Sequence, residues 1–415
     1  MTQAPANCGL PPQLAGAFVS TALTFNANIL SREVQQFIAD HNNDDVVKLL
    51  LKGGEVGGVP MKAVTEQISA RRKLNEKLSE WTTTTGIYYP PALSVEQASS
   101  TLTAGYKTKY LSGKVLFDLT GGLGADTLAF STVYEKVYYV EQDPELCETA
   151  RHNFSRFSRT NIEVVCNNAE NFSDELPDGS DVFIDPSRRD EVGGKVFRLE
   201  DCRPDTGPLA ERLIAKNCRI LLKVSPLLDI RQALRQLPYA IKVIVLAVKN
   251  ECKELLFLMG PGGESPEITA VNLTGKEEDI FKFTNEDEAG SEVEISLPKK
   301  YIYLPNNAIL KAGAFRLVGQ RFGLKKLHIN THLYTSDQKQ EYFPGRVFLL
   351  KDVLKVDKRE VRKALPEGQA NVLTRNFPLP APALRDRLSL RDGGDDYICG
   401  VTLQDGKRRL LWLKK

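Results

Sequence analysis

The chain has 415 residues, of which 42% are hydrophobic and 26% are charged, and its formal net charge is +2. This length predicts two or three domains, and the hydrophobic content is enough to bury a sizeable core. No apolar run reaches the roughly 18 residues of a membrane span, and no basic start with an apolar stretch opens the chain, so neither a membrane span nor a secretory signal is expected.

The seven cysteines are scattered along the chain and form no C-x-x-C pair. An odd, dispersed set favours reduced thiols in the cytoplasm over a disulfide framework. It also argues against a structural zinc site. We therefore expect a cytoplasmic protein that holds no metal. The pattern does not predict an oligomeric state.

Charge is unevenly distributed between the two ends of the chain. Residues 301–415 contain 22 basic and 11 acidic residues, a net charge of +11, whereas residues 1–300 carry a net charge of −9. A basic C-terminal third on an acidic body is typical of a module that binds a polyanion. A solvated basic surface would produce the same count, so charge alone leaves both interpretations open.

The N-terminal part has a mostly helical pattern. From Pro60 to Trp81, apolar residues recur at helical spacing among charged ones, after a flexible break expected at Gly53–Gly58. The capping-box pattern of Ser94 and Gln97 then predicts a helix from about Val95 to Tyr110.

From Lys114 onward, predicted strands alternate with predicted helices. Helices are expected to start near Ala125, Pro144, Leu209 and Leu228. Alternation at this spacing predicts βαβ units and a mostly parallel sheet with helices on both faces. The expected strands cover residues 115–118, 137–141, 162–166, 181–185, 219–224, 241–247 and 255–259.

The stretch Gly260–Pro266 is the clearest predicted domain boundary. Beyond it, short strands mix with helices, which predicts an α+β region. Helices are expected near 306–321, 358–365 and 381–389. The expected strands cover 267–273, 280–284, 300–304, 325–334, 346–354, 370–374, 397–403 and 408–413.

A glycine-rich turn, Asp118 to Thr127 (DLTGGLGADT), follows the first strand of the alternating region. A strand that ends in an acid and enters such a turn presents backbone N–H groups to a nucleotide-like ligand. Three more landmarks follow in order: Glu141 ending the second strand, the pair Asn168-Ala169, and Asp185-Pro186 ending the fourth strand.

This ordered set resembles the class I S-adenosylmethionine (SAM) methyltransferases. The resemblance implies that SAM is the cofactor and that Glu141 binds its ribose hydroxyls, while Asp118 faces its ammonium end. The cofactor-binding residues are expected to be Asp118, Thr120, Gly121, Gly122, Gly124, Glu141, Gln142, Asn168 and Ala169, with the glycines leaving room for the ligand and the last three flanking the adenine. A dinucleotide site is the alternative, although Thr127 stands where G-x-G-x-x-G has its third glycine.

The segment Asp185-Pro186-Ser187-Arg188-Arg189 resembles the D/N-P-P-aromatic motif of amino-group methyltransferases. The resemblance implies that Asp185 holds a target N–H and Pro186 stiffens the turn, so that catalysis rests on alignment. Arg188 replaces the aromatic residue, and an Arg can stack on a base or hold a phosphate. Arg189 is expected to contact substrate, and a surface ion-pairing role for both arginines is the alternative.

The same segment also resembles the RNA 5-methyluracil methyltransferases, whose later S-C-N-P strand end supplies a nucleophilic cysteine. The parallel segment here ends in Ser225-Pro226 without a cysteine, which disfavours methylation at pyrimidine C5. Lys223 lies two residues before Ser225, near the end of this strand. A structural role for this lysine is an equal alternative to a role in the site.

The sequence contains two further candidates, one for a metal site and one for a nucleophile. His328 and His332 fall in a segment that alternates like a strand, where they share a face too far apart to chelate easily, so a surface or RNA-facing role is favoured over a metal. Cys252 is a weak candidate nucleophile in an expected loop at 250–254.

Nearly the whole chain resembles a bacterial family of class I methyltransferases with a ferredoxin-like subdomain and a C-terminal THUMP-like domain. The resemblance implies a helical region at 1–88, a methyltransferase domain at 89–260, a ferredoxin-like subdomain at 266–322 and a THUMP-like domain at 323–415. It rests on the stretches 96–107 (EQASSTLTAGYK), 118–127, 139–154, 184–190, 221–230, 250–256 (NECKELL), 306–316, 326–336, 343–346, 376–378 and 392–397.

THUMP domains of other enzymes bind RNA, so the resemblance implies methylation of a base nitrogen in tRNA or rRNA. Candidate RNA contacts are Lys325, Lys326, His328, His332, Arg346, Arg375, Arg385 and Arg387. Methylation of a small molecule or a protein, and a non-catalytic RNA-binding role, are the alternatives.

Overall fold

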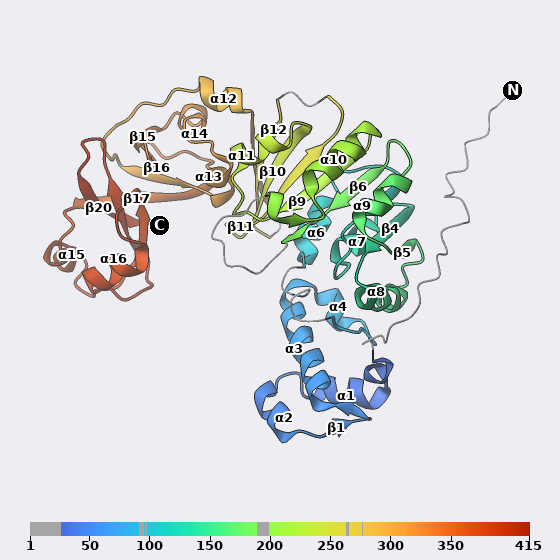
Figure 1. The fold of residues 1–415 in the computed structure, drawn as a ribbon. Helices are drawn as coiled ribbons and strands as arrows, with labels where there is room; N and C mark the ends of the chain where they lie inside the picture. The colour runs from blue at the N-terminus through green and yellow to red at the C-terminus, as the bar shows by residue number, and fades with distance from the viewer. Residues whose placement is uncertain (1–25, 91–94, 96–97, 189–198, 263–264, 276) are drawn as a thin grey trace.

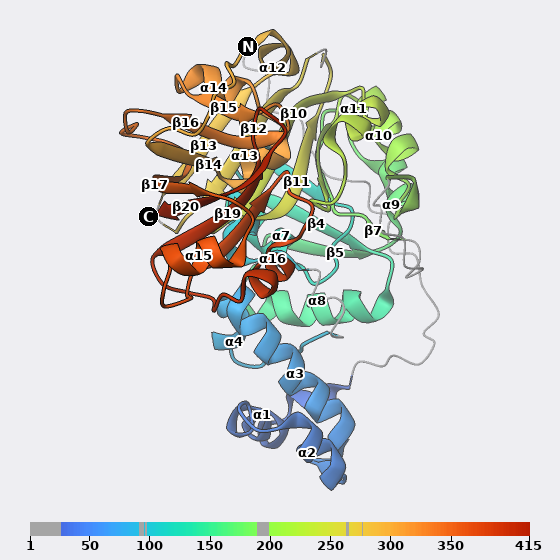
Figure 2. The same cartoon turned by 90° about the vertical axis from the view of Figure 1, so that its left-hand side faces the viewer.

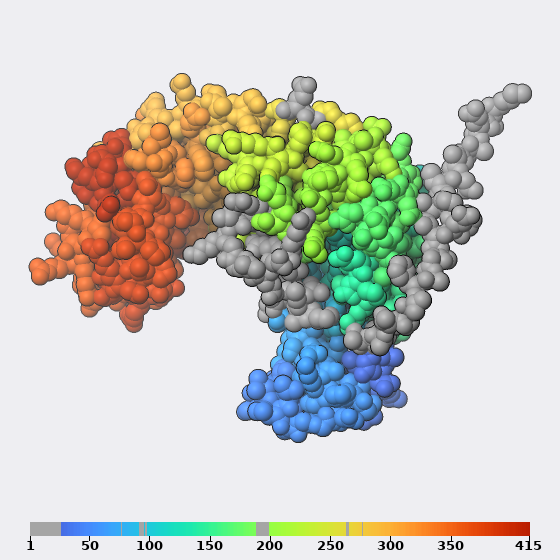
Figure 3. Space-filling view, in the orientation of Figure 1, coloured from blue at the N-terminus to red at the C-terminus, as the bar shows by residue number. Residues whose placement is uncertain are grey.

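The computed structural model describes residues 26–90, 95, 98–188, 199–262, 265–275 and 277–415. Figure 1 shows three regions: N-terminal helices at the bottom, a large sheet flanked by helices, and a second sheet at the left that carries the C-terminus. In the space-filling view the N-terminal and C-terminal regions form separate lobes on the central body (Figure 3). This is the predicted fold class, an α/β methyltransferase-like sheet between a helical region and an α+β module.

The N-terminal region is helical, as predicted, with one small hairpin. Its core contains Val34, Ile38, Val64 and Ile68. The expected flexible break is instead a two-stranded hairpin whose turn uses positive φ at Gly57 and Gly58. The elements are η1 (Ala27–Leu30), α1 (Arg32–Asp40), α2 (Val46–Lys52), β1 (Glu55–Val56), β2 (Val59–Pro60), α3 (Met61–Lys77) and α4 (Ser79–Thr83).

The helix before the large sheet is shorter than predicted. The expected cap residues Ser94 and Gln97 lie outside the described residues, and α6 runs only from Thr101 to Lys107. Ser100 caps it: its Oγ accepts a hydrogen bond from Thr103 N at 3.2 Å, while Ser100 N donates to Thr103 Oγ1 at 3.1 Å. A capping box is therefore present at Ser100.

The large sheet has nine strands in the order β13-β12-β10-β11-β9-β6-β3-β4-β5. From β9 to β5 all neighbours are parallel, and β11 runs antiparallel to both β9 and β10. The strands are β3 (Val115–Asp118), β4 (Lys136–Glu141), β5 (Ile162–Cys166), β6 (Asp181–Ile184), β9 (Arg219–Val224), β10 (Ala240–Val248), β11 (Glu251–Met259), β12 (Glu267–Leu273) and β13 (Glu278–Phe283).

The sheet continues past the expected boundary at 260–266. Strand β12 pairs in parallel with β10, and β13 then pairs with β12, so both extend the same sheet. The expected loop at 250–254 is also corrected, because β11 begins at Glu251 and Cys252 lies within it. Only the positive-φ pair Lys249-Asn250 forms the turn before β11.

Helices and a short two-stranded β-ribbon connect the parallel strands, and Figure 2 shows the helices from a second side. Asp229 caps α11 by accepting a hydrogen bond from Gln232 N at 2.8 Å, which starts this helix two residues after the expected Leu228. These elements are α7 (Ala125–Phe130), α8 (Pro144–Arg156), α9 (Ala169–Phe172), η2 (Ser173–Glu175), β7 (Ser187–Arg188), η3 (Leu199–Asp201), β8 (Cys202–Arg203), α10 (Thr206–Ala215) and α11 (Ile230–Gln236).

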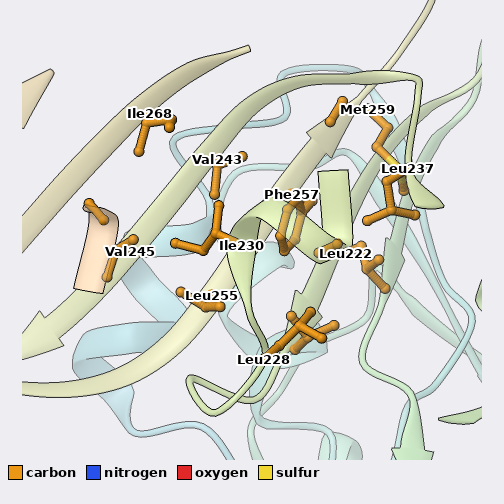
Figure 4. Close-up of a cluster of buried hydrophobic side chains, with 14 of the residues drawn as sticks. Leu222, Leu228, Ile230, Leu237, Val243, Val245, Leu255, Phe257, Met259 and Ile268 are labelled. Atoms are coloured by element: carbon orange, nitrogen blue, oxygen red, sulfur yellow. The ribbon is translucent and has the colours of Figure 1, made fainter. Parts of the chain in front are cut away.

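One hydrophobic core continues from the large sheet into the C-terminal region. Side chains of β9 to β12 pack with those around α11, among them Leu222, Phe257, Val243, Ile268 and Ile230 (Figure 4). The same core includes residues of the C-terminal region. The two sheets therefore share buried apolar surface.

The C-terminal region is α+β, as predicted, around a seven-stranded sheet in the order β15-β16-β14-β17-β20-β19-β18. The strands are β14 (Tyr301–Pro305), β15 (Lys325–His328), β16 (Thr331–Ser336), β17 (Gly345–Leu354), β18 (Asn371–Arg375), β19 (Asp396–Thr402) and β20 (Arg408–Lys414). The helices are α12 (Asn285–Gly290), α13 (Asn307–Ala312), α14 (Leu317–Arg321), α15 (Lys358–Ala364) and α16 (Ala381–Leu388).

Two predicted elements of this region are each split in two. The helix expected at 306–321 ends at Gly313, which has φ +89° at the C-cap, and α14 starts after the turn. The strand expected at 325–334 is the antiparallel hairpin β15–β16, in which His328 pairs with Thr331. Each interruption is a tight turn, and the apolar periodicity of the sequence continues across it.

Helix α13 fastens the C-terminal region to the large sheet. It lies against β10, β11 and β12. Asn307 N donates to Asn250 Oδ1, and Asn307 Nδ2 donates to the Asn250 carbonyl, both at 2.7 Å. No helix within the described ranges is long and apolar enough to cross a membrane.

Candidate active site

The carboxyl ends of four neighbouring parallel strands bring together charged side chains that lie far apart in the sequence. Asp118 ends β3, Glu141 ends β4, Asp185 follows β6, and Lys223 lies one residue before the end of β9. Parallel strands present these ends at one edge of the sheet, where ligands of open α/β folds bind.

Asp118 is buried, with 1% of its surface exposed. Its Oδ2 accepts a hydrogen bond from Thr127 Oγ1 at 2.5 Å, and its Oδ1 accepts one from Thr120 N at 3.2 Å. Burial raises the pKa of Asp118 to about 7, and the nearby carboxylates of Asp126 and Asp185 push it in the same direction. The carboxyl group can therefore change charge near neutral pH.

Thr120 connects the glycine turn to Asp185. Its hydroxyl accepts a hydrogen bond from Asp185 N at 2.6 Å, while its own N–H donates to Asp118. The predicted cofactor segment and the predicted catalytic segment are thus in direct contact.

The glycines of the turn serve different purposes. A Cβ on Gly121 would lie 2.2 Å from the ring of Tyr139, and a Cβ on Gly124 would lie 2.6 Å from Phe154. Both glycines make room for packed rings. Gly122 has φ +52°, and an added Cβ there would have only the Thr120 carbonyl near it, at 3.8 Å.

Glu141 folds back onto the turn. Its Oε2 accepts a hydrogen bond from Gly122 N at 3.0 Å, and its Oε1 accepts from Gln142 N at 2.8 Å and Asp143 N at 3.0 Å. The residue is partly exposed, and the side chain of Gln142 is exposed beside it. A carboxylate oxygen has two lone pairs, so Oε1 is already satisfied by its two donors, whereas Oε2 retains capacity for a hydroxyl.

The turn at Asn168 lies next to Glu141. Asn167 N donates to the Glu141 carbonyl at 3.0 Å. Asn168 Oδ1 caps α9 by accepting from Asn171 N at 2.7 Å, and Ala169 is buried. The structure therefore brings Asn168 close to Glu141, with its amide oxygen already used as a helix cap.

Asp185 is paired with Lys223. Lys223 Nζ lies 2.5 Å from Asp185 Oδ2, and the Asp185 side chain is 32% exposed against 10% for Lys223. Pro186 is buried, and Arg188 belongs to β7, which pairs with β8. Arg189 lies outside the described residues.

Three further charged residues extend this pair into the protein interior. Lys107 Nζ lies 2.9 Å from Asp126 Oδ1 and 2.7 Å from Glu254 Oε2, and Asp126 Oδ2 lies 4.0 Å from Lys223 Nζ. Ser99 Oγ donates to Asp126 Oδ2 at 2.8 Å. We call Glu254, Lys107, Asp126, Lys223 and Asp185 the charge chain.

Burial and mutual attraction shift the pKa values of Lys223, Asp126 and Asp185. Burial opposes the charge of Lys223, but the carboxylates of Asp185, Glu254 and Asp126 raise its pKa above the usual value. Burial likewise opposes the charge of Asp126, and Lys107 and Lys223 lower its pKa. Burial raises the pKa of Asp185, and Lys223 partly offsets that rise. Lys223 is therefore protonated at neutral pH.

Sequence reasoning missed Ser99, Lys107, Asp126 and Glu254. A signal existed for Glu254, because it opens the apolar run Leu255-Leu256-Phe257 inside a buried strand. An unpaired carboxylate there would be costly, so a buried cationic partner was to be expected. Its partner Lys107 lies on α6, so the pairing depends on where α6 lies relative to β11.

The predicted substrate residues of the C-terminal region lie on its own sheet, apart from the strand-end acids. Lys326 is buried, and its Nζ donates to the Ile329 carbonyl at 2.6 Å. The His332 ring stacks on Phe315 at 3.7 Å, and burial lowers its pKa to about 4. His328 Nδ1 accepts from Asn330 N at 3.0 Å, whereas Arg346 is exposed.

Three comparisons with known proteins agree with this architecture. A family model for a ferredoxin-like domain matches residues 301–344, and one for a THUMP domain-like region matches residues 345–415. The crystal structure of a candidate methyltransferase from Porphyromonas gingivalis W83 is 34% identical, covers 95% of this chain and 100% of its own, and superposes with a TM-score of 0.83. An uncharacterised S-adenosylmethionine-dependent methyltransferase of Mycobacterium tuberculosis is 26% identical over 79% of this chain and 89% of its own.

Proposed function

The chain belongs to the bacterial family of class I SAM-dependent methyltransferases with a ferredoxin-like and a THUMP-like domain, and from that membership we propose that it methylates a base nitrogen in RNA. The observation that carries the proposal is the Lys223–Asp185 pair, which holds a carboxylate beside the glycine turn.

The residues at the strand edge fit SAM. Glu141 Oε2 accepts one hydrogen bond and keeps acceptor capacity, which suits a ribose hydroxyl. Open space above Gly122 leaves room for a ligand to approach the backbone. When bound, SAM supplies an electrophilic methyl group on a sulfonium. Asp118, Thr120, Glu141, Gln142, Asn168 and Ala169 would hold it.

The sign of the local charge also suits a cationic donor. The charge chain contains the carboxylates of Asp126, Asp185 and Glu254 but only two lysines. Asp118 adds a further negative charge when it is ionised. An excess of negative charge in a buried site attracts a cation and favours its retention.

Asp185 supports transfer to nitrogen. A carboxylate accepts hydrogen bonds only, so it orients an N–H nucleophile and points its lone pair toward the methyl group. Ser225, in the place where a C5 pyrimidine enzyme would need a thiol, supplies no such nucleophile.

The charge of the C-terminal region supports an RNA substrate. Helix α15 exposes Lys358, Arg359, Arg362 and Lys363. Together with exposed Arg346, these cations can contact phosphates without reading sequence. Arg188 and Arg189 are proposed to contact the same RNA near the methyl donor.

We place this activity in the cytoplasm. Five cysteines in the part of the chain that the structure describes are free thiols, which suits a reducing compartment: Cys147, Cys166, Cys218, Cys252 and Cys399.

The test is transfer of labelled methyl from SAM onto total RNA from a bacterial strain that lacks this gene, fractionated by size, with Asp185→Ala as the control. Label in the tRNA or rRNA fraction, lost in the variant, is the expected result. A quadruple variant of Lys358, Arg359, Arg362 and Lys363 to Gln should keep its affinity for S-adenosylhomocysteine and lose most of the RNA labelling. Binding of S-adenosylhomocysteine without label in any RNA fraction would overturn the RNA assignment in favour of a small-molecule or protein substrate.

A further inference from the structure

We propose that Lys107 is a positioning residue for methyl transfer: by neutralising Asp126 it keeps Lys223 on Asp185, so that one oxygen of Asp185 stays free to accept the N–H of the substrate. The inference rests on the proposed function, since it assigns a role to residues behind Asp185.

Lys107 is placed to act on its neighbours and not on a ligand. It has no exposed surface, and its ammonium contacts three side chains: Asp126 at 2.9 Å, Glu254 at 2.7 Å and Ser99 at 2.7 Å. Burying an ammonium is unfavourable unless it is fully paired, so these contacts hold it in one position. It therefore presents a fixed positive charge to Asp126.

Asp126 stands between two lysines at unequal distances. It lies 2.9 Å from Lys107 and 4.0 Å from Lys223. Lys223 in turn lies 2.5 Å from Asp185. Lys223 thus has two carboxylates within reach, and it sits on the one that Lys107 has not already neutralised. The pairing of Lys223 with Asp185 follows from the pairing of Lys107 with Asp126.

This arrangement divides the oxygens of Asp185 between two tasks. Oδ2 is held by Lys223, and none of the described residues donates a hydrogen bond to Oδ1. The side chain is 32% exposed, so Oδ1 is the acceptor that a substrate N–H can reach. If Lys223 turned to Asp126, Asp185 would lose both its orientation and its counterion.

Among the described residues, charged groups act on Asp185 from four neighbouring elements. Lys223 on β9 and Lys107 on α6 stabilise its charge, while Asp126 on α7 and Asp118 on β3 oppose it. Glu254 on β11 acts on Asp185 through the two lysines. Removing Lys107 and removing Asp126 should therefore move the ionisation of Asp185 in opposite directions.

The pH dependence of labelling measures this opposition. With SAM at saturating concentration, so that the protonation of Asp118 does not limit binding, the acidic limb of the rate profile reports the protonation of Asp185. In Lys107→Met it should move up by about one pH unit, because Asp185 loses its counterion. In Asp126→Asn the acidic limb should move to lower pH, because Asp185 is then the only one of these two carboxylates that can pair with Lys223. Lys107→Arg should restore the wild-type limb, and Lys109→Met, a change at an exposed lysine two residues away, should leave it unmoved.

A crystal structure of full-length Lys107→Met gives a readout that does not depend on activity. The proposal expects Lys223 Nζ to leave Asp185 and approach Asp126. It is overturned if Lys223 stays on Asp185 there, or if both variants shift the acidic limb in the same direction. If Lys107→Met fails to fold, the pH profiles of the near-isosteric Asp126→Asn and of Lys107→Arg test the proposal in its place. Should wild-type protein label no RNA, the proposed function falls, and the position of Lys223 alone decides the role of Lys107.

Discussion

The amide of Asn153 exchanges two hydrogen bonds with the backbone of Tyr88: Tyr88 N donates to Asn153 Oδ1 at 2.9 Å, and Asn153 Nδ2 donates to the Tyr88 carbonyl at 2.8 Å. Asn153 lies on α8 and has no exposed surface. This exchange attaches the end of the N-terminal helical region to the methyltransferase sheet.

Asn153→Leu should loosen that attachment. The substitution removes both of these buried hydrogen bonds, at a cost of about 1–3 kcal/mol each. We expect a lower melting temperature and early proteolytic cleavage within residues 26–90. Ser155→Ala, an exposed position on the same helix, serves as the control. Equal melting and cleavage of the two variants would show that the exchange contributes little.

The glycine turn should respond unequally to alanine. Gly121→Ala would place a Cβ 2.2 Å from the Tyr139 ring, so we expect a loss of stability of about 1–3 kcal/mol. Gly122→Ala meets open space and should cost about 1 kcal/mol of backbone strain at its positive φ. Chemical denaturation measures both. Recovery of Gly121→Ala by a second change, Tyr139→Leu, would confirm the cause, whereas no recovery would exclude the ring contact.

These glycines show what the sequence could and could not predict. The strand ends, the turn and the order of Asp118, Glu141 and Asp185 follow from local patterns of apolar residues, glycines and acids. Why Gly121 must be glycine depends on Tyr139, a residue of the next strand, and such packing leaves no local signal. The charge chain was missed for the same reason, because Lys107 and Glu254 lie far apart in sequence and meet only once β11 is inserted antiparallel beside β9.

Asp118 should make the stability of the ligand-free protein depend on pH. Its pKa is about 7 in the folded chain, against the ordinary 3.8 of an aspartate, so ionising it in place opposes folding. The stability it contributes is complete below the lower value and is lost as pH rises through about 7, a difference of about 4 kcal/mol. Relative to Asp118→Asn, the wild-type protein should therefore lose stability from about pH 4 to about pH 8. Parallel melting curves for the two proteins across this range would contradict the assignment.

Asp118 should also make cofactor affinity depend on pH, with affinity increasing as pH rises. Below about pH 7 Asp118 is protonated and no longer attracts the ammonium end of the cofactor, so binding weakens as pH falls. Calorimetric titration with S-adenosylhomocysteine should show this trend in the wild type and a weak, flat dependence in Asp118→Asn. A wild-type affinity that does not change between about pH 6 and about pH 8 would remove Asp118 from contact with the ligand.

Glu141→Ala should weaken S-adenosylhomocysteine binding about tenfold or more, because hydrogen bonds to a carboxylate contribute about 1.5–3 kcal/mol. Part of the loss comes from the turn itself, since Glu141 also accepts hydrogen bonds from Gly122 N and Gln142 N. Glu163→Ala, at an exposed glutamate of neighbouring β5, is the matched control and should bind normally. Equal affinities of the two variants would place the ribose elsewhere.

Two basic residues of the C-terminal sheet should behave differently toward RNA, because one is exposed and the other is not. Arg346→Ala removes an exposed cation and should lower the slope of log affinity against log salt by about 1. Lys326 is buried, so its ammonium lies away from any phosphate that approaches the surface. Burial also lowers its pKa to about 8. Lys326→Met should accordingly keep the wild-type salt slope while changing the melting temperature. The measurement is filter binding of total RNA from the deletion strain at several salt concentrations. A slope that changes in Lys326→Met but not in Arg346→Ala would move the RNA surface to the face of the hairpin β15–β16.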